Sequence, residues 1–278
     1  MKFDGYKLRD EILDDVFAEA ERALGARLDP SGITYGTQGA TVGLPTTADT
    51  WVRVAWSAPE KVRLQAWTGG EIASAVVGVK KPELYRSYRW VDRNRSVVWR
   101  ADEVELIRSK AVHPTGVIDS DPDLPAGWWE GLASSLVALA GFPTRRVGMP
   151  QEHLTRRINQ VFGDEGVATE VDEWTTAHAD VHWGNVTAPD FYLLDWEDWG
   201  LGPRGLDAAT LWVGSLLVPA VADVVQKVFA DDLNTRSGLL AQLLVCSNVI
   251  RINSGKPTPS PLLEPARREA DRLLDALR

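Results

Sequence analysis

Hydrophobic positions recur every three or four residues near both ends of the chain. Between Lys7 and Leu28 the apolar positions are Leu8, Ile12, Leu13, Val16, Phe17, Ala20 and Leu24, with acids and arginines between them. Across residues 262–277 they are Leu263, Ala266, Ala270, Leu273, Leu274 and Leu277. This spacing places the apolar side chains on one face of a helix, so each segment predicts an amphipathic helix.

The next segment has the alternation of strands. ITYGTQGATVGLP contains short β-type stretches interrupted by Gly36, Gly39 and Gly43, and TWVRVAWS alternates apolar with polar residues. Together they predict a hairpin followed by a third strand. Tyr85–Val91 and Val97–Leu106 predict two further strands, and residues 60–77 predict a helix that carries a glycine pair at its middle.

The pattern changes after about residue 108. HPTGVIDSDPDLPAG is rich in Pro, Gly and Asp, and helical periodicity follows at Trp128–Ala140, residues 151–162 and Leu206–Val218. Strands followed by helices predict an α+β protein. We therefore expect a two-lobed fold, with a small, mostly β N-lobe over residues 1–108, a helical C-lobe over 109–278, and the active site in the cleft between them.

Composition narrows the class of protein. The chain is 44% apolar and 25% charged, which is ordinary for a soluble globular protein. No window approaches the roughly 20 apolar residues of a membrane span, so we expect a cytoplasmic protein with no membrane partner. A formal charge of -9 argues against a nucleic-acid partner. The single cysteine, Cys246, excludes an intrachain disulfide and a cysteine-based zinc site, and the oligomeric state has no signature.

The segment HADVHWGN carries the strongest chemical signal. Asp180 follows His178 by two positions and precedes Asn185 by five, which is the kinase catalytic-loop register H-x-D-x-x-x-x-N. Asp195 comes ten residues after Asn185, at the end of an apolar run. Phosphoryl transfer needs a carboxylate to orient the attacking hydroxyl and oxygen ligands to hold magnesium. These three residues supply such groups.

The same segment allows a second interpretation. His178, Asp180 and His182 could form a metal cluster of the hydrolase type. Zinc sites of that type usually need further histidines, and the other two, His113 and His153, lie in no ligand-like motif. We therefore favour structural roles for His178 and His182, with both side chains packing the loop and bonding to backbone carbonyls.

The motifs HADVHWGN, YLLDWE and GPRGLDAATLW resemble those of the aminoglycoside phosphotransferase family, whose members phosphorylate small molecules. Many members have Gly where this chain has Ala179, a change that is costly only if the residue has a positive φ angle. The resemblance implies that Asp180 is the catalytic base and that Asn185 and Asp195 bind Mg²⁺. It also implies a protein-kinase-like fold, and that Asp207 supports the catalytic loop from the start of a helix. Asp207 could equally be a simple acid at a helix N-terminus, stabilising through the helix dipole.

The resemblance extends more loosely to a nucleotide site in the N-lobe. GTQGATVG, with Gly36 and Gly39, is similar to the flap whose backbone amides approach the phosphates. Arg53 stands where a kinase has its phosphate-binding lysine, and Glu71 is the expected partner of Arg53. The adenine would bind backbone groups near Ala101, Asp102 and Glu103.

The activity implied is an ATP- or GTP-dependent O-phosphotransferase acting on a hydroxyl of a small molecule. The candidate acceptor is an aminoglycoside or another sugar- or nucleoside-bearing antibiotic, with resistance or self-protection as the role. A protein kinase is disfavoured because Asp195 is followed by Trp-Glu, and Asp207 leaves no room for an activation segment. The alternative is a pseudokinase-like module that binds nucleotide without turnover, which Arg53 and Ala179 favour.

Overall fold

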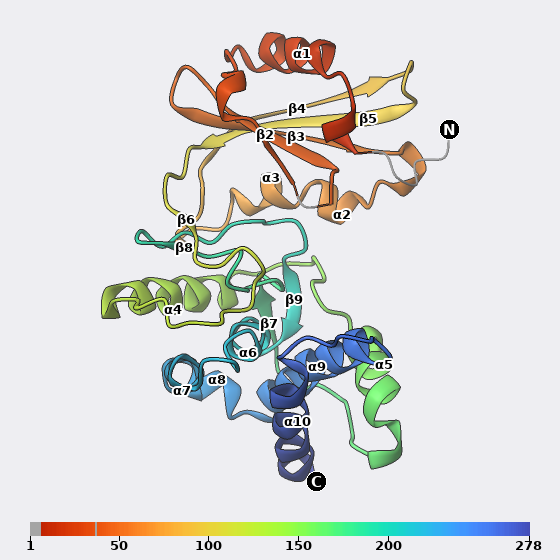
Figure 1. Cartoon of the computed structure of the whole chain (residues 1–278), viewed down its shortest axis with the longest axis vertical. Coiled ribbons are helices and arrows are strands. Elements are labelled where there is room, and N and C mark those ends of the chain that lie inside the picture. Colours follow the sequence, from red (N-terminus) through yellow and green to blue (C-terminus); the bar gives the residue numbers. More distant parts are fainter. Residues whose placement is uncertain (1–6, 37) are drawn as a thin grey trace. The chain divides into compact units, whose positions relative to one another are not determined.

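The computed structural model describes residues 7–36 and 38–278, so Thr37 of the predicted glycine flap lies outside the described residues. The chain divides into two compact units (Figure 1). The first contains the chain up to Ser74 together with Pro82–Arg108. The second contains Ala75–Lys81 and Ser109–Arg278. The segment Ala75–Lys81 thus groups with the second unit, although in sequence it lies within the expected N-lobe.

The first unit is built on a five-stranded sheet whose order is β1-β2-β3-β5-β4. All neighbouring strands are antiparallel. The strands are β1 (Thr34–Tyr35), β2 (Thr41–Pro45), β3 (Thr50–Ser57), β4 (Leu84–Asp92) and β5 (Val97–Glu105). The predicted hairpin, the third strand and the two later strands are therefore all present.

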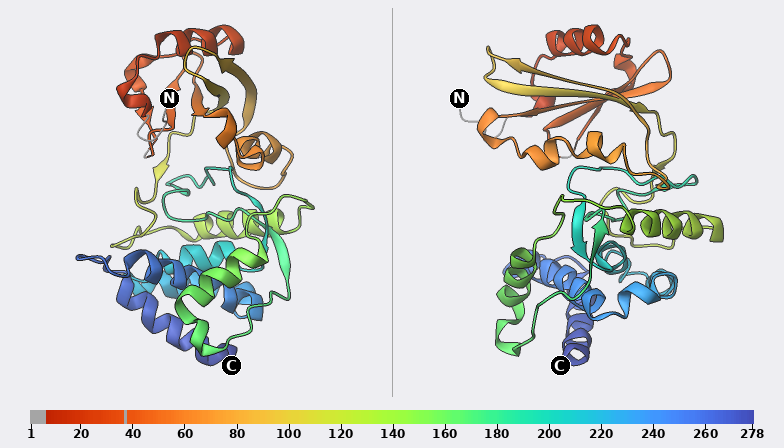
Figure 2. Two further views of the ribbon diagram at one scale, coloured as in Figure 1. Left: turned by 90° about the vertical axis from the view of Figure 1, so that its right-hand side faces the viewer. Right: turned by 180° about the vertical axis from the view of Figure 1, so that it is seen from behind.

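Helices lie on both faces of this sheet (Figure 1). They are α1 (Asp14–Leu24) on one face, and α2 (Leu64–Trp67) and α3 (Gly69–Ala73) on the other (Figure 2). The apolar face of α1 packs on the inward side chains of the strands, which form one core that includes Val16, Val52, Val54 and Trp99. Alternate residues of β3 point to opposite faces, so Arg53 faces away from that core.

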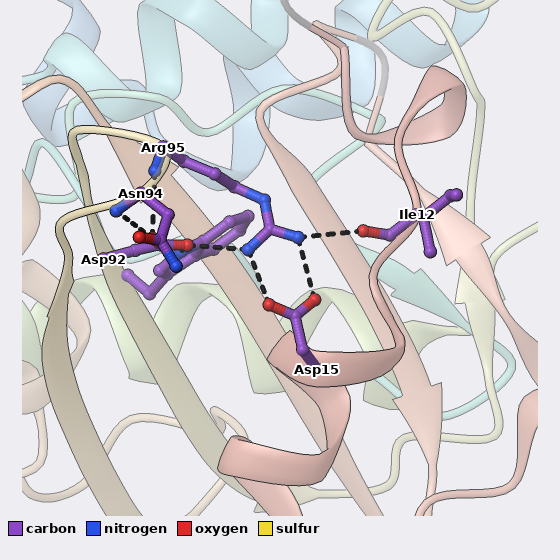
Figure 3. Close-up of polar contacts among 6 residues, drawn as sticks. Ile12, Asp15, Asp92, Asn94 and Arg95 are labelled. Carbon is purple, nitrogen blue, oxygen red and sulfur yellow. Dashed lines mark hydrogen bonds and ion pairs between the residues drawn. The ribbon is translucent and has the colours of Figure 1, made fainter.

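A charged clamp fastens the β4–β5 turn to the start of α1 (Figure 3). The Arg95 guanidinium donates to both carboxylate oxygens of Asp15, at 2.7 and 2.8 Å, and to Asp92 at 2.7 Å. It also donates to the backbone carbonyl of Ile12 at 3.1 Å. These carboxylates raise the pKa of Arg95, and Arg95 lowers the pKa of Asp15. The clamp joins segments about 80 residues apart and keeps every charge paired.

The second unit is mainly helical. Its helices are α4 (Ala126–Ala140), α5 (Gln151–Phe162), α6 (Leu206–Val213), α7 (Pro219–Val228), α8 (Ala230–Leu233), α9 (Arg236–Asn253) and α10 (Leu263–Leu277). Two small antiparallel pairs join them, β6 (Lys110–Ala111) with β8 (Thr187–Ala188), and β7 (Trp174–Ala177) with β9 (Gly200–Pro203). Helix α9 packs against α5, α6 and α10, and Cys246 on it is buried, as predicted.

Three of the predicted helices differ from the observed ones. The helix expected over Lys7–Leu28 begins only at Asp14, after a separate turn at Leu8–Asp10. The helix expected over residues 60–77 is two short helices, α2 and α3, separated at Thr68 just before the glycine pair. The helix expected over Leu206–Val218 ends at Val213, and Gly214 follows it. None of the helices in the described part of the chain is both long and apolar enough to cross a membrane.

Candidate active site

The loop His178–Asn185 lies in the second unit and connects β7 to β8. Strand β7 is paired along its length with β9, which fixes the point at which the loop begins. At the other end, the carbonyl of Val186 accepts the N–H of Val112 at 2.9 Å, and β8 pairs with β6. The loop is thus held at both ends by backbone pairing, and its polar side chains are placed by the fold rather than by their own preferences.

Asp207 anchors the first half of this loop from the start of α6. Its two carboxylate oxygens accept the backbone N–H groups of His178 and Ala179, each at 2.8 Å. The carboxylate is buried, and burial raises its pKa to about 6, although the two N–H donors oppose this shift. The prediction that Asp207 supports the loop from a helix start is confirmed.

Asp180 and Asn185 meet directly. The Asn185 side-chain amide donates to the backbone carbonyl of Asp180 and to its carboxylate Oδ2, both at 3.0 Å. His182 Nε2 lies 3.6 Å from the same oxygen. Burial raises the pKa of Asp180, His182 and Asn185 oppose the shift, and the carboxylates of Asp198 and Glu197 add to it. A carboxylate with a raised pKa is a stronger base once it is ionised.

Two residues of the site have left-handed backbone conformations. Ala179 has a φ of 67° and Asp195 a φ of 65°. The Ala in place of the family's Gly therefore occupies the conformation in which that change is costly, by about 1 kcal/mol. Asp195 is exposed, and the residue before it, Leu194, donates its N–H to the carbonyl of Asn185 at 2.8 Å. That bond ties the Asp195 segment to the loop of Asp180 and Asn185.

His178 has a structural position. It is fully buried, and its ring meets Trp196 edge to face with the centroids 4.8 Å apart. Burial lowers its pKa to about 3, and the nearby carbonyl of Leu194 opposes this only in part. His178 is therefore neutral at physiological pH and packs the loop, as predicted. Neither ring nitrogen has a hydrogen bond of ordinary geometry within the described residues, so the carbonyl of Leu194 is a weaker partner than the backbone carbonyl we expected.

Four tryptophans close in sequence to the site motifs are buried in the core. Trp183 and Trp199 are fully buried, and Trp196 and Trp212 are nearly so. Trp183 stacks on Trp128 at 6.0 Å and donates to the Ser215 hydroxyl at 3.0 Å. These rings are part of the core, and Trp196 contacts His178 of the loop, so they are not available to stack on a ligand.

Among the nucleotide-site candidates of the first unit, the glycines are set in a tight turn. Gly39 has a φ of 75° and donates its N–H to the carbonyl of Gly36 at 3.0 Å. A Cβ atom at Gly36 would lie 2.1 Å from the Thr41 hydroxyl, so a side chain there would force that hydroxyl to move. The turn has the small residues that a phosphate-binding flap needs, and hairpin packing alone also requires Gly36.

Arg53 and Glu71 do not match the arrangement expected for them. Arg53 lies near the middle of β3, opposite Gly43 and Asp102 in its two neighbours. The carboxylate of Glu71 on α3 forms an ion pair with Arg89 of β4, where we expected Arg53. Arg89 and Arg53 lie on strands separated by β5, and the sequence pattern gives no rule that distinguishes one arginine from the other.

Ala101 and Glu103 lie inside β5, paired with β3 on one side and β4 on the other. The Glu103 carboxylate is buried, accepts a hydrogen bond from the Thr50 hydroxyl at 2.8 Å and pairs with Arg86. Backbone groups within a central strand are already used by the sheet, so these positions are poorly suited to bind adenine. Strand β5 ends at Glu105, so backbone groups just after that residue suit such a contact better.

The residues fit a hard divalent cation rather than zinc. Within residues 7–36 and 38–278, no group of three His, Cys, Asp or Glu side chains could hold a metal ion, which argues against the zinc-hydrolase interpretation. Asn185 uses its amide nitrogen toward Asp180, so its Oδ1 is left for another partner. One amide oxygen and one carboxylate, completed by phosphate oxygens and water, is a donor set that Mg²⁺ accepts.

Comparison with solved structures gives the fold. Amicoumacin kinase hAmiN, in complex with AMP-PNP, Ca²⁺ and Ami, matches over 95% of this chain and 94% of its own, with 10% identity and a TM-score of 0.59. The GDP and kanamycin complex of APH(2")-IIia matches over 96% and 97%, with 13% identity and a TM-score of 0.56. The chain has the fold of small-molecule kinases.

A choline/ethanolamine kinase family protein from Mesorhizobium loti adds to this group. It matches over 95% of this chain and 94% of its own, with 14% identity and a TM-score of 0.53. No family model and no curated protein sequence matches the chain. The expected kinase-like fold is thus confirmed by structure, at identities where fold similarity outlasts sequence similarity.

Sequence reasoning missed two contributors to the site. Trp128 on α4 supports the loop region by donating to the carbonyl of Thr187 at 2.7 Å and stacking on Trp183. Arg146 is buried and donates to the backbone carbonyls of Glu197 and Trp199. Trp128 could have been found from the helical periodicity of its segment. Arg146 stands next to Arg145 in a loop, and no sequence pattern separates the two.

Proposed function

We propose that this protein is an O-phosphotransferase that transfers the γ-phosphoryl group of ATP or GTP to a hydroxyl of a small molecule. The observation that carries the proposal is the pair Asp180–Asn185, joined by a hydrogen bond between their side chains. Asp207 anchors the loop that contains this pair by accepting two of its backbone N–H groups. The kinase-like fold supports it. The similar enzymes named for amicoumacin and for aminoglycosides suggest an antibiotic with several hydroxyls as the acceptor.

In this proposal Asp180 is the base. Its carboxylate accepts the proton of the acceptor hydroxyl as the hydroxyl oxygen attacks the γ-phosphorus. The bond from that phosphorus to the leaving nucleoside diphosphate breaks in the same step. The amide of Asn185 holds Oδ2, which leaves Oδ1 to face the hydroxyl. Positioned base catalysis of this kind contributes about 10²- to 10⁴-fold to rate.

Asn185 and Asp195 would hold Mg²⁺, whose contribution when bound is to neutralise charge on the phosphate oxygens. The Oδ1 atom of Asn185 and the carboxylate of the exposed Asp195 are the donors. In the first unit, the glycine turn and Arg53 are our candidates for contacts with the nucleotide. The end of β5 near Glu105 is our candidate for the adenine contact.

The experiment is a turnover assay with ATP and GTP against aminoglycosides, nucleosides and macrolides, followed by detection of the phosphorylated product. Asp180→Asn keeps the size of the side chain and removes its basicity, so we expect turnover to fall by about 10²- to 10⁴-fold. Asp223→Asn, an exposed residue of α7, is the matched control and should change nothing. Unchanged turnover in Asp180→Asn would refute the assigned base.

A nucleotide-binding protein without turnover is the second candidate. It is favoured by the left-handed Ala179 and by the pairing of Glu71 with Arg89 instead of Arg53. Calorimetry with a non-hydrolysable ATP analogue separates the two. Nucleotide binding with no product from any acceptor would support this candidate, and any phosphorylated product that depends on Asp180 would eliminate it.

A further inference from the structure

Arg146 stands out because it is a buried cation in a loop that has no part in the expected chemistry. Only 8% of the residue is exposed. Its Nε donates to the carbonyl of Trp199 at 2.9 Å and its Nη2 to the carbonyl of Glu197 at 2.8 Å. The guanidinium also lies 4.6 Å from the centre of the Trp199 ring. One side chain therefore fixes two carbonyls and one ring in the segment that follows Asp195.

The backbone around Arg146 is fitted to the same segment. The carbonyl of Arg146 accepts the N–H of Leu201 at 2.8 Å, and Gly148 donates to the carbonyl of Leu201 at 2.9 Å. A Cβ at Gly148 would lie 2.9 Å from that of Ala179 and 3.1 Å from the carbonyl of Asp198. The segment 146–148 thus contacts both the loop of Asp180 and the turn after Asp195.

Asp195 needs such support because of its backbone. Its φ of 65° is a conformation that a residue with a side chain keeps only when its surroundings determine it. Before Asp195, Leu194 is bonded to Asn185, and the indole of Trp196 donates to the carbonyl of Leu193 at 2.9 Å. After Asp195, the two carbonyls held by Arg146 limit where the chain can go.

The free-energy cost of burying the Arg146 charge also indicates a role other than stabilising the fold. Burial lowers the pKa of Arg146, and the charge of Asp198 opposes this only in part. A buried charge usually costs more than an apolar side chain of similar size, so Arg146 is poorly explained as a stabilising residue. A guanidinium has a planar fork of donors, which sets direction in a way that neither an apolar nor an ammonium group does.

We propose that Arg146 is a positioning residue for divalent-metal binding, because it fixes the turn Glu197–Trp199 and thereby aims the carboxylate of Asp195. The inference rests on the proposed function, in which Asp195 and Asn185 hold the metal. Arg146 itself touches neither metal nor substrate, and it acts through the backbone that carries Asp195.

The test measures metal affinity apart from turnover. Mn²⁺ binding is followed by electron paramagnetic resonance with a saturating non-hydrolysable ATP analogue, and nucleotide binding without metal is measured by calorimetry. In Arg146→Met, which keeps the bulk of the side chain, we expect at least a tenfold weaker Mn²⁺ affinity and unchanged metal-free nucleotide binding. Arg145→Met, the exposed neighbour, is the matched control and should behave as wild type.

Two further results keep the inference falsifiable. Arg146→Lys keeps the charge but lacks the fork, so Mn²⁺ affinity should weaken at least threefold, and a smaller change would overturn the proposal. This variant decides the matter if Arg146→Met fails to fold. Folded Arg146→Met that binds Mn²⁺ like wild type would also overturn it. If wild type and the Arg145→Met control both fail to bind Mn²⁺ in the presence of nucleotide, the proposed function is refuted instead.

Discussion

The β4–β5 turn of the first unit and the loop region of the second are both held by polar side chains, but by opposite means. In the first, Arg95 meets two carboxylates near the surface, and its pKa is raised by them. In the second, buried Arg146 meets backbone carbonyls, and buried Asp207 meets backbone N–H groups. Burial favours the neutral form of both side chains, so it lowers the pKa of Arg146 and raises the pKa of Asp207.

The difference separates two uses of charge. A pair of opposite charges near water has modest energy and tolerates small movements of either partner. A buried charge that bonds to backbone groups costs free energy, and it holds those groups in one direction. The surface clamp should therefore act on the stability of the first unit, and the buried contacts on the geometry of the candidate active site. Four experiments test this division.

The largest effect is expected from Asp207→Ala. The variant leaves the N–H groups of His178 and Ala179 buried without acceptors, so the loop that carries Asp180 should shift. Displacements of about 1 Å at a reacting group lower rates by about 100-fold, and we expect a loss of that order in turnover. Asp223→Ala is the control. Turnover within threefold of wild type in a folded Asp207→Ala protein would contradict the comparison.

The second-largest effect is expected in the pH dependence of the free energy of unfolding. Asp207 has a pKa of about 6 in the folded protein against 3.8 for the free side chain, so between these values the folded state binds more protons. The Asp207 contribution to the free energy of unfolding should therefore fall as pH rises from about 4 to 6, by about 3 kcal/mol at most, while buried His178, whose pKa of about 3 lies below its ordinary value, contributes a rise over the same range. Urea unfolding of wild type and Asp207→Ala at several pH values measures it, because the difference between the two proteins isolates the Asp207 contribution and should shrink as pH rises from about 4 to 6.

Arg95→Met should lower the free energy of unfolding by about 1 kcal/mol and leave turnover unchanged. Arg93→Met, an exposed arginine in the same turn, is the matched control. Because Arg95 lowers the pKa of Asp15, the clamp contributes fully above about pH 4 and is lost as pH falls further. The two proteins should thus converge in stability in acid. A change in turnover would show that the first unit's clamp also affects the chemistry.

The smallest effect concerns salt. Adding about 1 M NaCl should reduce the Arg95 contribution by a few tenths of a kcal/mol, because the pair with Asp15 is near solvent and is screened. Arg146 is buried and bonds to backbone carbonyls, so the difference between wild type and Arg146→Met should change less with salt than the difference for Arg95→Met. Urea unfolding of the three proteins at low and high salt measures both. Equal salt sensitivity would remove the distinction between the two regions.

Local patterns predicted most of the elements. Strand alternation gave β2 to β5, and the three- and four-residue spacing gave α1, α4, α5 and α10 with errors mainly at their ends. The errors occur where a local break outweighs periodicity, as at Thr68 before two glycines. The register of Asp180 with Asn185 and Asp195 identified the candidate site because such spacing serves one kind of chemistry. Glu71 paired with Arg89 instead of Arg53, because the partner of a helix acid depends on strand order.

What the sequence determined by itself is the set of groups that can do chemistry, since residue type and spacing within one loop are local properties. It also determined the succession of strands and helices, which depends on periodicity. Only the tertiary structure decided that Ala179 and Asp195 have left-handed backbones, that the Asp207 carboxylate accepts the N–H groups of His178 and Ala179, and that Arg146 rather than Arg145 is buried against Trp199. These features depend on contacts between segments far apart in the chain, and packing selects among side chains that look alike in the sequence.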